Sequence, residues 1–222
     1  MHQRISKKIL IYLSIFFILV TINNKKISLD FYGIKEFNII SPYDLDTKKI
    51  YDDLKILTNT NIFSFDKKQI FKIINSNKSI EEFKVLKVYP STLNIEIKKT
   101  KYLAITKKDN VDYLVGANGN LIEINDINYE LPFIFGNINI ENFLNFKKMI
   151  DISKFKFSEL KSIYYFNSNR WDIVDKKGSI VKFPHNISVA KLNLFYEITK
   201  KDNFKDLKTL DFRQNGILVI NE

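Results

Sequence analysis

Histidine and cysteine, which often act as nucleophiles, general bases or metal ligands, are scarce in this chain. It has two histidines and no cysteine. His2 lies in a short basic leader. His185 follows a Phe-Pro dipeptide that predicts a loop, where a solvated or packed histidine is far more common than a catalytic one. The lack of cysteine excludes disulfides, thiolate metal sites and thiol nucleophiles. We therefore expect no catalytic residue and no metal or cofactor site.

Carboxylates and glycines also form no recognisable site. Asp52-Asp53 and Glu81-Glu82 are neighbours in sequence, and neighbouring side chains point apart on a helix or strand, which makes a poor acid/base pair. The glycine-rich segment 113–122 has neither Walker nor dinucleotide-binding spacing, and its pattern predicts a hairpin. The sequence therefore predicts a protein that is not an enzyme, binds no small-molecule substrate and acts through its surfaces.

The composition indicates an ordered protein. Of the 222 residues, 45% are hydrophobic and 27% are charged, which is ordinary for a folded chain of one large or two small domains. Lys and Arg exceed Asp and Glu by 35 to 25, for a net charge of +10. Basic residues are interspersed with acidic ones and form no stripe. This charge fits a solvated surface, and we expect no nucleic-acid partner.

An uncharged, largely apolar run near the N-terminus predicts a membrane anchor. It begins at Ile9 and ends at Asn24. The run is short for a spanning helix, which needs about 20 apolar residues, so its length also suits the core of a signal peptide or a buried helix. No small-x-small cleavage site follows Val20, and flanking lysines extend the effective span by reaching the headgroups. We expect an uncleaved anchor over residues 9–24.

Basic residues flank this predicted anchor on both sides. Arg4, Lys7 and Lys8 precede it, and two lysines follow it. With the amino terminus counted, the positive-inside bias favours a cytoplasmic leader at residues 1–8 by a small margin. After a linker at residues 25–32, the rest of the chain would lie outside the cytoplasm. The expected topology is that of a single-pass type II membrane protein.

Residues 33–101 predict one compact unit with the order β-α-α-β-β. Runs at 34–40 and 80–89 are rich in β-branched and aromatic residues, as strands are. A third strand at 93–97 alternates apolar and polar residues, as in a half-buried strand. Two apolar stripes at helical spacing, each after a capping aspartate, predict the helices. The stripes are Ile50, Leu54 and Leu57 after Asp44 or Asp46, and Ile70, Ile73 and Ile74 after Asp66.

This order resembles a POTRA domain, and two motifs resemble the FtsQ type in particular. Residues 62–66, Ile-Phe-Ser-Phe-Asp, are similar to the segment that enters the second helix in that family. Residues 89–95, Tyr-Pro-Ser-Thr-Leu-Asn-Ile, are similar to its Pro-x-Thr-Leu-x-Ile turn and strand, the more specific of the two. The segment 98–104 departs from the Glu-Arg and Pro-Val-Ala that usually follow. The chain thus resembles the FtsQ/DivIB family.

Residues 102–222 continue this resemblance with the same order of elements. The Leu-Pro-x-Ile-x-Gly strand of the family is matched at 131–136, and Leu-Asp-Phe-Arg at 210–213 resembles its Val-Asp-Leu-Arg strand. Helices are predicted at 140–150 and after Ser188, with three strands between them, and Trp171 is expected in the core. The fold class implied is α+β: a transmembrane helix, a POTRA domain at 33–101, and a mixed α/β domain at 102–222 built on an antiparallel sheet with an exposed C-terminal edge strand.

The resemblance implies a non-enzymatic scaffold of the divisome. Such a bitopic protein of the inner membrane has most of its chain in the periplasm. It links early cytoplasmic and late periplasmic division proteins and controls septal peptidoglycan synthesis. The implied partners are FtsB-like and FtsL-like small coiled-coil proteins and the septal wall synthase complex. A POTRA-containing envelope assembly or transport protein is the alternative.

The resemblance also places the partner site on the last strand, where a segment of the FtsB-like partner would pair by β-strand addition. An exposed edge offers unpaired N–H and C=O groups to another chain. Asn215-Gly216 also has the pattern of a hairpin turn, which would split the strand. Because Ile217 to Ile220 are apolar on both faces, burial within the chain's own domain is an alternative for them. The partner-binding residues carried over from the family are Phe212, Arg213, Gln214, Gly216, Ile217 and Val219.

Overall fold

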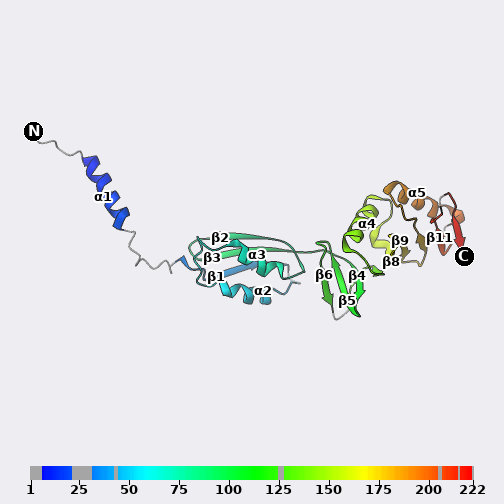
Figure 1. The fold of residues 1–222 in the computed structure, drawn as a ribbon, viewed down its shortest axis with the longest axis horizontal. Helices are drawn as coiled ribbons and strands as arrows, with labels where there is room; N and C mark the ends of the chain where they lie inside the picture. The colour runs from blue at the N-terminus through cyan, green and yellow to red at the C-terminus, as the bar shows by residue number, and fades with distance from the viewer. Residues whose placement is uncertain are drawn as a thin grey trace, which may run out of the picture. The chain divides into compact units, whose positions relative to one another are not determined.

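A computed structural model describes residues 7–21, 32–42, 45–124, 128–204, 207–214 and 216–221. The chain divides into two compact units, each described by itself below (Figure 1). Unit 1 comprises Met1–Ile74 and Lys84–Glu96, and unit 2 comprises Asn75–Phe83 and Ile97–Glu222. The predictions for His2, Arg4, Asp44, Asn215 and nearly all of the linker lie outside the described residues.

The N-terminal apolar run forms a helix. Helix α1 spans Lys7–Thr21, and its apolar side chains from Ile9 to Val20 are exposed. At 1.5 Å per residue its 15 residues extend about 22 Å. Among the described residues, the structure contains no helix whose length and apolar character suffice to cross a membrane. The anchor over residues 9–24 therefore stays a prediction.

A three-stranded sheet with two helices follows, in the predicted order β-α-α-β-β. The elements are β1 (Glu36–Ile40), α2 (Thr47–Leu54), the 3-10 helix η2 (Lys55–Leu57), α3 (Lys67–Asn75), β2 (Ile80–Val88) and β3 (Thr92–Lys99). Strand β3 lies between β1 and β2, and β1 runs parallel to it with Glu36 opposite Thr92. The sequence pattern thus predicted the elements of this region correctly.

Local signals account for these helices. The side chain of Asp46 accepts a hydrogen bond from the Lys48 backbone N–H at 3.0 Å at the start of α2. The side chain of Asp66 does the same for Lys68 at 2.9 Å before α3, so both predicted caps are confirmed. The helices and β3 bury their apolar stripes against one another. The buried residues are Ile50, Leu54, Leu57, Ile70, Ile74, Leu93, Ile95 and Ile97, while Ile73 is only half-buried.

Unit 2 is built on a nine-stranded sheet with the order β12-β11-β10-β9-β8-β7-β4-β5-β6. Its strands are β4 (Tyr102–Lys108), β5 (Val111–Gly116), β6 (Leu121–Ile124), β7 (Phe133–Phe135), β8 (Leu160–Phe166), β9 (Arg170–Asp175), β10 (Ile180–Lys182), β11 (Thr209–Asp211) and β12 (Val219–Asn221). The helices are α4 (Ile140–Ile152) and α5 (Val189–Thr199), with short 3-10 helices η3 (Phe157–Glu159) and η4 (Asp202–Phe204).

This sheet is mixed, whereas the sequence predicted an antiparallel one. The pairs β4/β7, β7/β8 and β10/β11 are parallel, and the other pairs with a printed register are antiparallel. Helix α4 connects β7 to β8, and α5 connects β10 to β11. A helical crossover returns the chain to the same end of the sheet, which makes the next strand parallel. The predicted helices are present, but their role as crossovers was missed.

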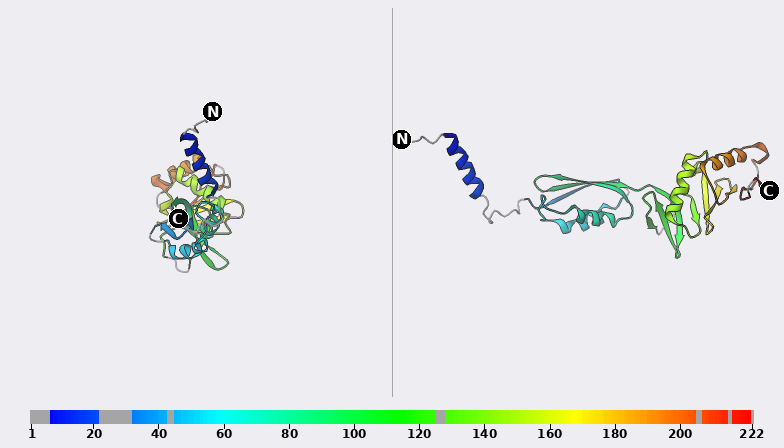
Figure 2. Two further views of the ribbon diagram at one scale, coloured as in Figure 1. Left: turned by 90° about the vertical axis from the view of Figure 1, so that its left-hand side faces the viewer. Right: turned by 45° about the horizontal axis from the view of Figure 1, so that its top comes forward.

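Helices α4 and α5 lie on the same side of this sheet (Figure 2) and share its core. Phe143, Phe146 and Ile150 of α4 are fully buried. The ring of Phe146 stacks on Trp171 of β9 with centroids 4.5 Å apart. Trp171 is buried, so its predicted core position is confirmed. Phe146 lies three residues from Phe143 and so on the same buried face of the helix.

Candidate functional site

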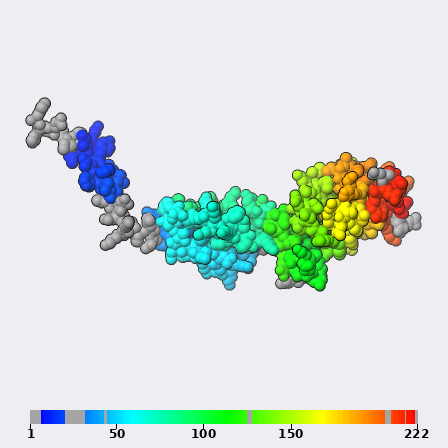
Figure 3. Space-filling model, in the orientation of Figure 1, coloured from blue at the N-terminus to red at the C-terminus, as the bar shows by residue number. Residues whose placement is uncertain are grey.

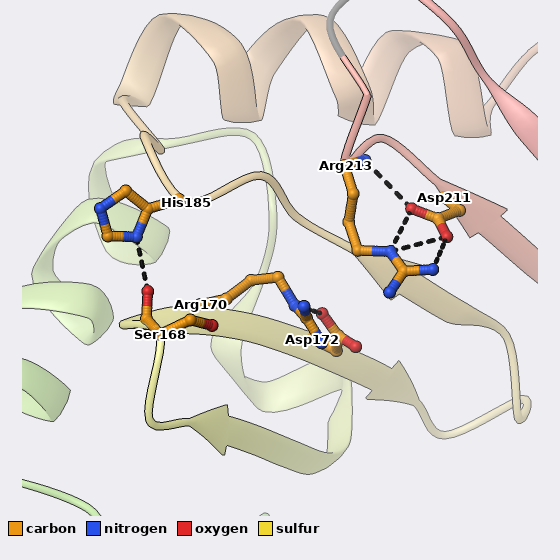
Figure 4. Close-up of polar contacts among 6 residues, drawn as sticks. All are labelled: Ser168, Arg170, Asp172, His185, Asp211 and Arg213. Carbon is orange, nitrogen blue, oxygen red and sulfur yellow. Dashed lines mark hydrogen bonds and ion pairs between the residues drawn. The ribbon is translucent and has the colours of Figure 1, made fainter.

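The side chains that sequence analysis considered for chemistry are separate in the structure. His185 lies with Nδ1 2.6 Å from the Ser168 carbonyl oxygen (Figure 4), a contact that ties its loop to the β8–β9 turn. Asp52 pairs with Lys55 at 2.8 Å, away from Asp53. In the described ranges, no cluster of three or more His, Asp or Glu side chains is arranged to hold a metal ion.

The C-terminal end of the nine-stranded sheet is a short hairpin. Strand β11 pairs antiparallel with β12, with Asp211 opposite Val219. Because β12 ends the strand order, only one of its sides is paired within the part of the chain that the structure describes. Gly216 lies in the connecting turn at φ +74°, which glycine adopts without strain. The strand predicted over 210–220 is therefore two strands, as the alternative with a turn predicted.

The side chains of β12 and the residues before it are exposed. Ile217 is 56% exposed, and Val219 and Ile220 are each 49% exposed, while Leu218 is half-buried. Adjacent strand residues point to opposite faces, so both faces of β12 carry an exposed apolar side chain. The alternative in which unit 2 buries both faces is therefore wrong. Figure 3 shows this C-terminal segment, in red, at the surface of unit 2.

The six predicted partner-binding residues divide into two groups. Phe212 is 6% exposed, and its ring stacks on Phe195 of α5 with centroids 4.1 Å apart. Its side chain therefore belongs to the core. It can stabilise the hairpin but cannot contact a partner directly. The other five are exposed and lie together in the hairpin: Arg213, Gln214, Gly216, Ile217 and Val219.

One carboxylate–guanidinium pair, Asp211 and Arg213, belongs to this hairpin, and a second pair, Asp172 and Arg170, lies on β9 (Figure 4). Nε of Arg213 donates to both carboxylate oxygens of Asp211 at 2.8 Å, which lowers the pKa of Asp211 from its usual value. Burial raises the pKa of Asp172, and the nearby Arg170 offsets this only in part. Nε of Arg170 lies 3.4 Å from Asp172, an ion-pair distance without hydrogen-bond geometry. The strongly bonded pair is therefore the one in the hairpin, and it fixes the backbone of Arg213.

An apolar groove of about 300 Å³ lies between α5 and the β11–β12 connection. Leu194 and Ile198 of α5 line one side, and Ile217 and Leu218 line the other. Helix α5 begins after Ser188, which accepts the Lys191 backbone N–H at 3.3 Å, so its predicted cap is confirmed. Sequence reasoning missed the contribution of α5. The only signal was Leu194, which falls outside the buried stripe of the helix, and a single exposed leucine is too common to indicate a site.

Comparison with known proteins identifies both folded regions. Residues 33–99 match the family described as "POTRA domain, FtsQ-type", and residues 104–213 match "Cell division protein FtsQ/DivIB, C-terminal". The chain belongs to the FtsQ/DivIB family. The resemblance drawn from the sequence motifs is thereby confirmed. The second match ends at Arg213, before β12. The role of β12 must therefore be inferred from the geometry of this chain.

Three curated relatives carry the name "Cell division protein DivIB". The protein of Clostridium botulinum strain Hall is 28% identical over 227 residues, covering 98% of this chain and 75% of the relative. That of strain Loch Maree is 30% identical over 122 residues, covering 55% and 46%, and that of Bacillus subtilis is 27% identical over 153 residues, covering 68% and 56%. The chain thus spans three quarters of the first relative and about half of the other two.

The solved structures that are similar to part of the chain include the major extracytoplasmic domain of DivIB from Geobacillus stearothermophilus, with 12% sequence identity and a TM-score of 0.34. The similarity covers 50% of this chain and 99% of that one.

Proposed function

We propose that this chain is a non-enzymatic scaffold of the division complex and that β12 binds an FtsB-like partner by β-strand addition. The observation that carries the proposal is an unpaired edge strand with exposed apolar side chains on both faces. Unpaired N–H and C=O groups of β12 would give affinity, and the side chains of Val219 and Ile220 would give selectivity. Family membership supports the division role, and FtsL-like proteins and the septal wall synthase complex are the further expected partners.

The proposal includes a single membrane span with a cytoplasmic N-terminus. Helix α1 exposes apolar side chains on all sides, which is unfavourable in water and favourable in lipid. The uncharged run continues past the end of α1 to Asn24, and Lys25 and Lys26 then provide headgroup contacts. Both folded units would then act outside the cytoplasm, at the face of the membrane where the wall is built.

A proline in β12 tests strand addition. The tagged full-length chain is crosslinked in cell membranes and purified, and the proteins that accompany it are identified by mass spectrometry. Asp211 turns its backbone groups toward Val219, so the N–H that points to the free edge of β12 is that of Ile220. Ile220→Pro removes this donor and is expected to abolish recovery of the small coiled-coil partner. Glu123→Pro in β6 is the matched control, because it places a proline in the opposite edge of the same sheet. Emission from the buried Trp171 reports whether unit 2 stays folded.

Each outcome bears on a different part of the proposal. Loss of the partner with Ile220→Pro but not with Glu123→Pro supports strand addition at β12. Equal recovery with Ile220→Pro and the wild type refutes that mechanism and leaves the scaffold role standing. If envelope assembly or transport proteins are recovered in place of division proteins, the scaffold role itself is refuted.

A further inference from the structure

Three aromatic residues at one end of unit 1 form an exposed patch, which we call the aromatic cluster. The rings of Phe63 and Tyr89 stack with centroids 4.7 Å apart, and Tyr32 meets Phe63 edge-on at 5.1 Å. Phe63 is 56% exposed and Tyr89 is 55% exposed. Neither ring is needed to close the core of unit 1, which is filled by the buried residues of α2, α3 and β3. Adjacent large apolar rings left open to solvent indicate a contact surface.

The aromatic cluster lies where the chain enters the three-stranded sheet region of unit 1. The carbonyl oxygen of Tyr32 accepts a hydrogen bond from the Ile62 backbone N–H at 2.9 Å, which joins the entering segment to the loop that carries Phe63. The Lys35 backbone N–H donates to the Ser91 carbonyl oxygen at 2.8 Å, which joins it to the turn that carries Tyr89. These two bonds fix the cluster to the first residues of this region.

Three lysines lie near the loop that carries Phe63. Nζ of Lys87 lies 3.4 Å from the Phe63 carbonyl oxygen. Lys67 and Lys68 are exposed at the start of α3, directly after that loop. Two carboxylates are also near: Asp66 accepts the Lys68 backbone N–H, and Glu36 accepts the Thr92 hydroxyl beside the turn that carries Tyr89. Three positive charges against two negative ones leave a small net positive charge near the rings.

We propose that the aromatic cluster docks into the headgroup region of an anionic membrane. This inference rests on the membrane span proposed above. Only residues 22–31 separate α1 from Tyr32, and this stretch reaches at most about 40 Å even when fully extended. The rings are therefore at the end of the three-stranded sheet region that the span holds closest to the bilayer. Aromatic rings with a polar tip favour the interface, and lysines favour anionic headgroups.

Tryptophan fluorescence in vesicles tests this docking with the full-length chain. Phe63→Trp places a reporter in the cluster. Phe71→Trp is the matched control, because Phe71 on α3 is also 56% exposed and belongs to the same unit. Trp171 is the one native tryptophan and is buried, so the wild type supplies the background. Each variant is reconstituted into phosphatidylcholine and phosphatidylglycerol vesicles whose lipids are brominated near the headgroup end of the acyl chains, because bromine quenches tryptophan on close approach.

We expect quenching of the Phe63→Trp variant to exceed that of Phe71→Trp about threefold or more, and to fall when phosphatidylglycerol is omitted. Tyr89→Trp provides a second reporter if Phe63→Trp perturbs its loop. A chain that floats with the vesicles while both reporters are quenched no more than Phe71→Trp overturns the docking and leaves the span intact. Equal quenching without phosphatidylglycerol overturns the anionic preference. A chain that fails to float with vesicles overturns the span, and the docking with it.

Discussion

Replacing Ile217 and Val219 by serine removes two apolar side chains from the unpaired edge of unit 2. They are 56% and 49% exposed, so roughly half of each remains for a partner to cover. Full burial of such a side chain contributes about 1.5–3 kcal/mol, so covering half of each contributes about 2 kcal/mol for the pair. The double variant should therefore raise the Kd for the strand-adding partner about thirtyfold.

The assay is a titration of the full-length chain, held in a membrane mimic, with the coiled-coil partner recovered in the crosslinking experiment. Ile152→Ser is the matched control, because Ile152 is 62% exposed at the end of α4 and is not part of the hairpin. The half of each side chain that is already buried is lost as well. The free energy of unfolding of unit 2, measured in urea with Trp171 emission, should therefore fall by about 2 kcal/mol in the double variant and by about 1 kcal/mol in Ile152→Ser.

A Kd for the double variant within about twofold of the wild-type value would refute the reasoning. It would mean that the exposed half of these side chains stays in water in the complex. An equal loss of affinity with Ile152→Ser would refute it differently, because the effect would then come from apolar surface anywhere on unit 2. Only a loss confined to the hairpin supports the edge as the binding site.

Three further predictions concern unit 2, each measured by urea unfolding with Trp171 emission. Gly136→Ala should lower the free energy of unfolding by about 3 kcal/mol or more, because φ is +105° and the new Cβ would lie 2.2 Å from the Tyr165 carbonyl oxygen. Gly178→Ala is the control: φ is +93° but the space around it is open, so the loss should be about 1 kcal/mol. Phe146→Ala should cost about 3–5 kcal/mol and shift Trp171 emission to the red, since it removes a fully buried ring stacked on the indole. Asp211→Asn should cost about 1 kcal/mol at neutral pH. Hydrogen bonds to Arg213 lower the pKa of Asp211 in the folded state. The ionised carboxylate therefore contributes its full stabilisation above the unfolded pKa of about 3.9 and loses it as the pH falls through the folded pKa. Acid should accordingly destabilise the wild type more than the variant.

Features that depend on neighbouring residues could be predicted from the sequence. The caps at Asp46, Asp66 and Ser188 are present because a side-chain oxygen near a helix start satisfies backbone N–H groups whatever the rest of the fold does. Strand direction is different. Whether β8 runs parallel or antiparallel to β7 depends on how α4 packs across the sheet, and no residue within either strand records it.

The same limit applies to the candidate site. Phe212 and Val219 are both apolar residues near the end of the chain, and sequence alone gives no reason to rank one above the other. The turn at Gly216 separates their roles, because it reverses the chain direction between them. Phe212 packs against Phe195 in the core, whereas Val219 lies on the outermost strand.

The turn also determines which residues can distinguish one partner from another. An edge strand offers the same backbone groups to any partner, so main-chain hydrogen bonds alone give little selectivity between partners. Selection must come from side chains at the surface, and in the hairpin most of these follow Arg213, where the family match ends. If β12 binds a partner as proposed, Ile217, Val219 and Ile220 are therefore the residues of this chain that would have to fit that partner. Exchanging those three residues for the equivalents of another family member should accordingly change which coiled-coil protein is bound while leaving strand addition intact.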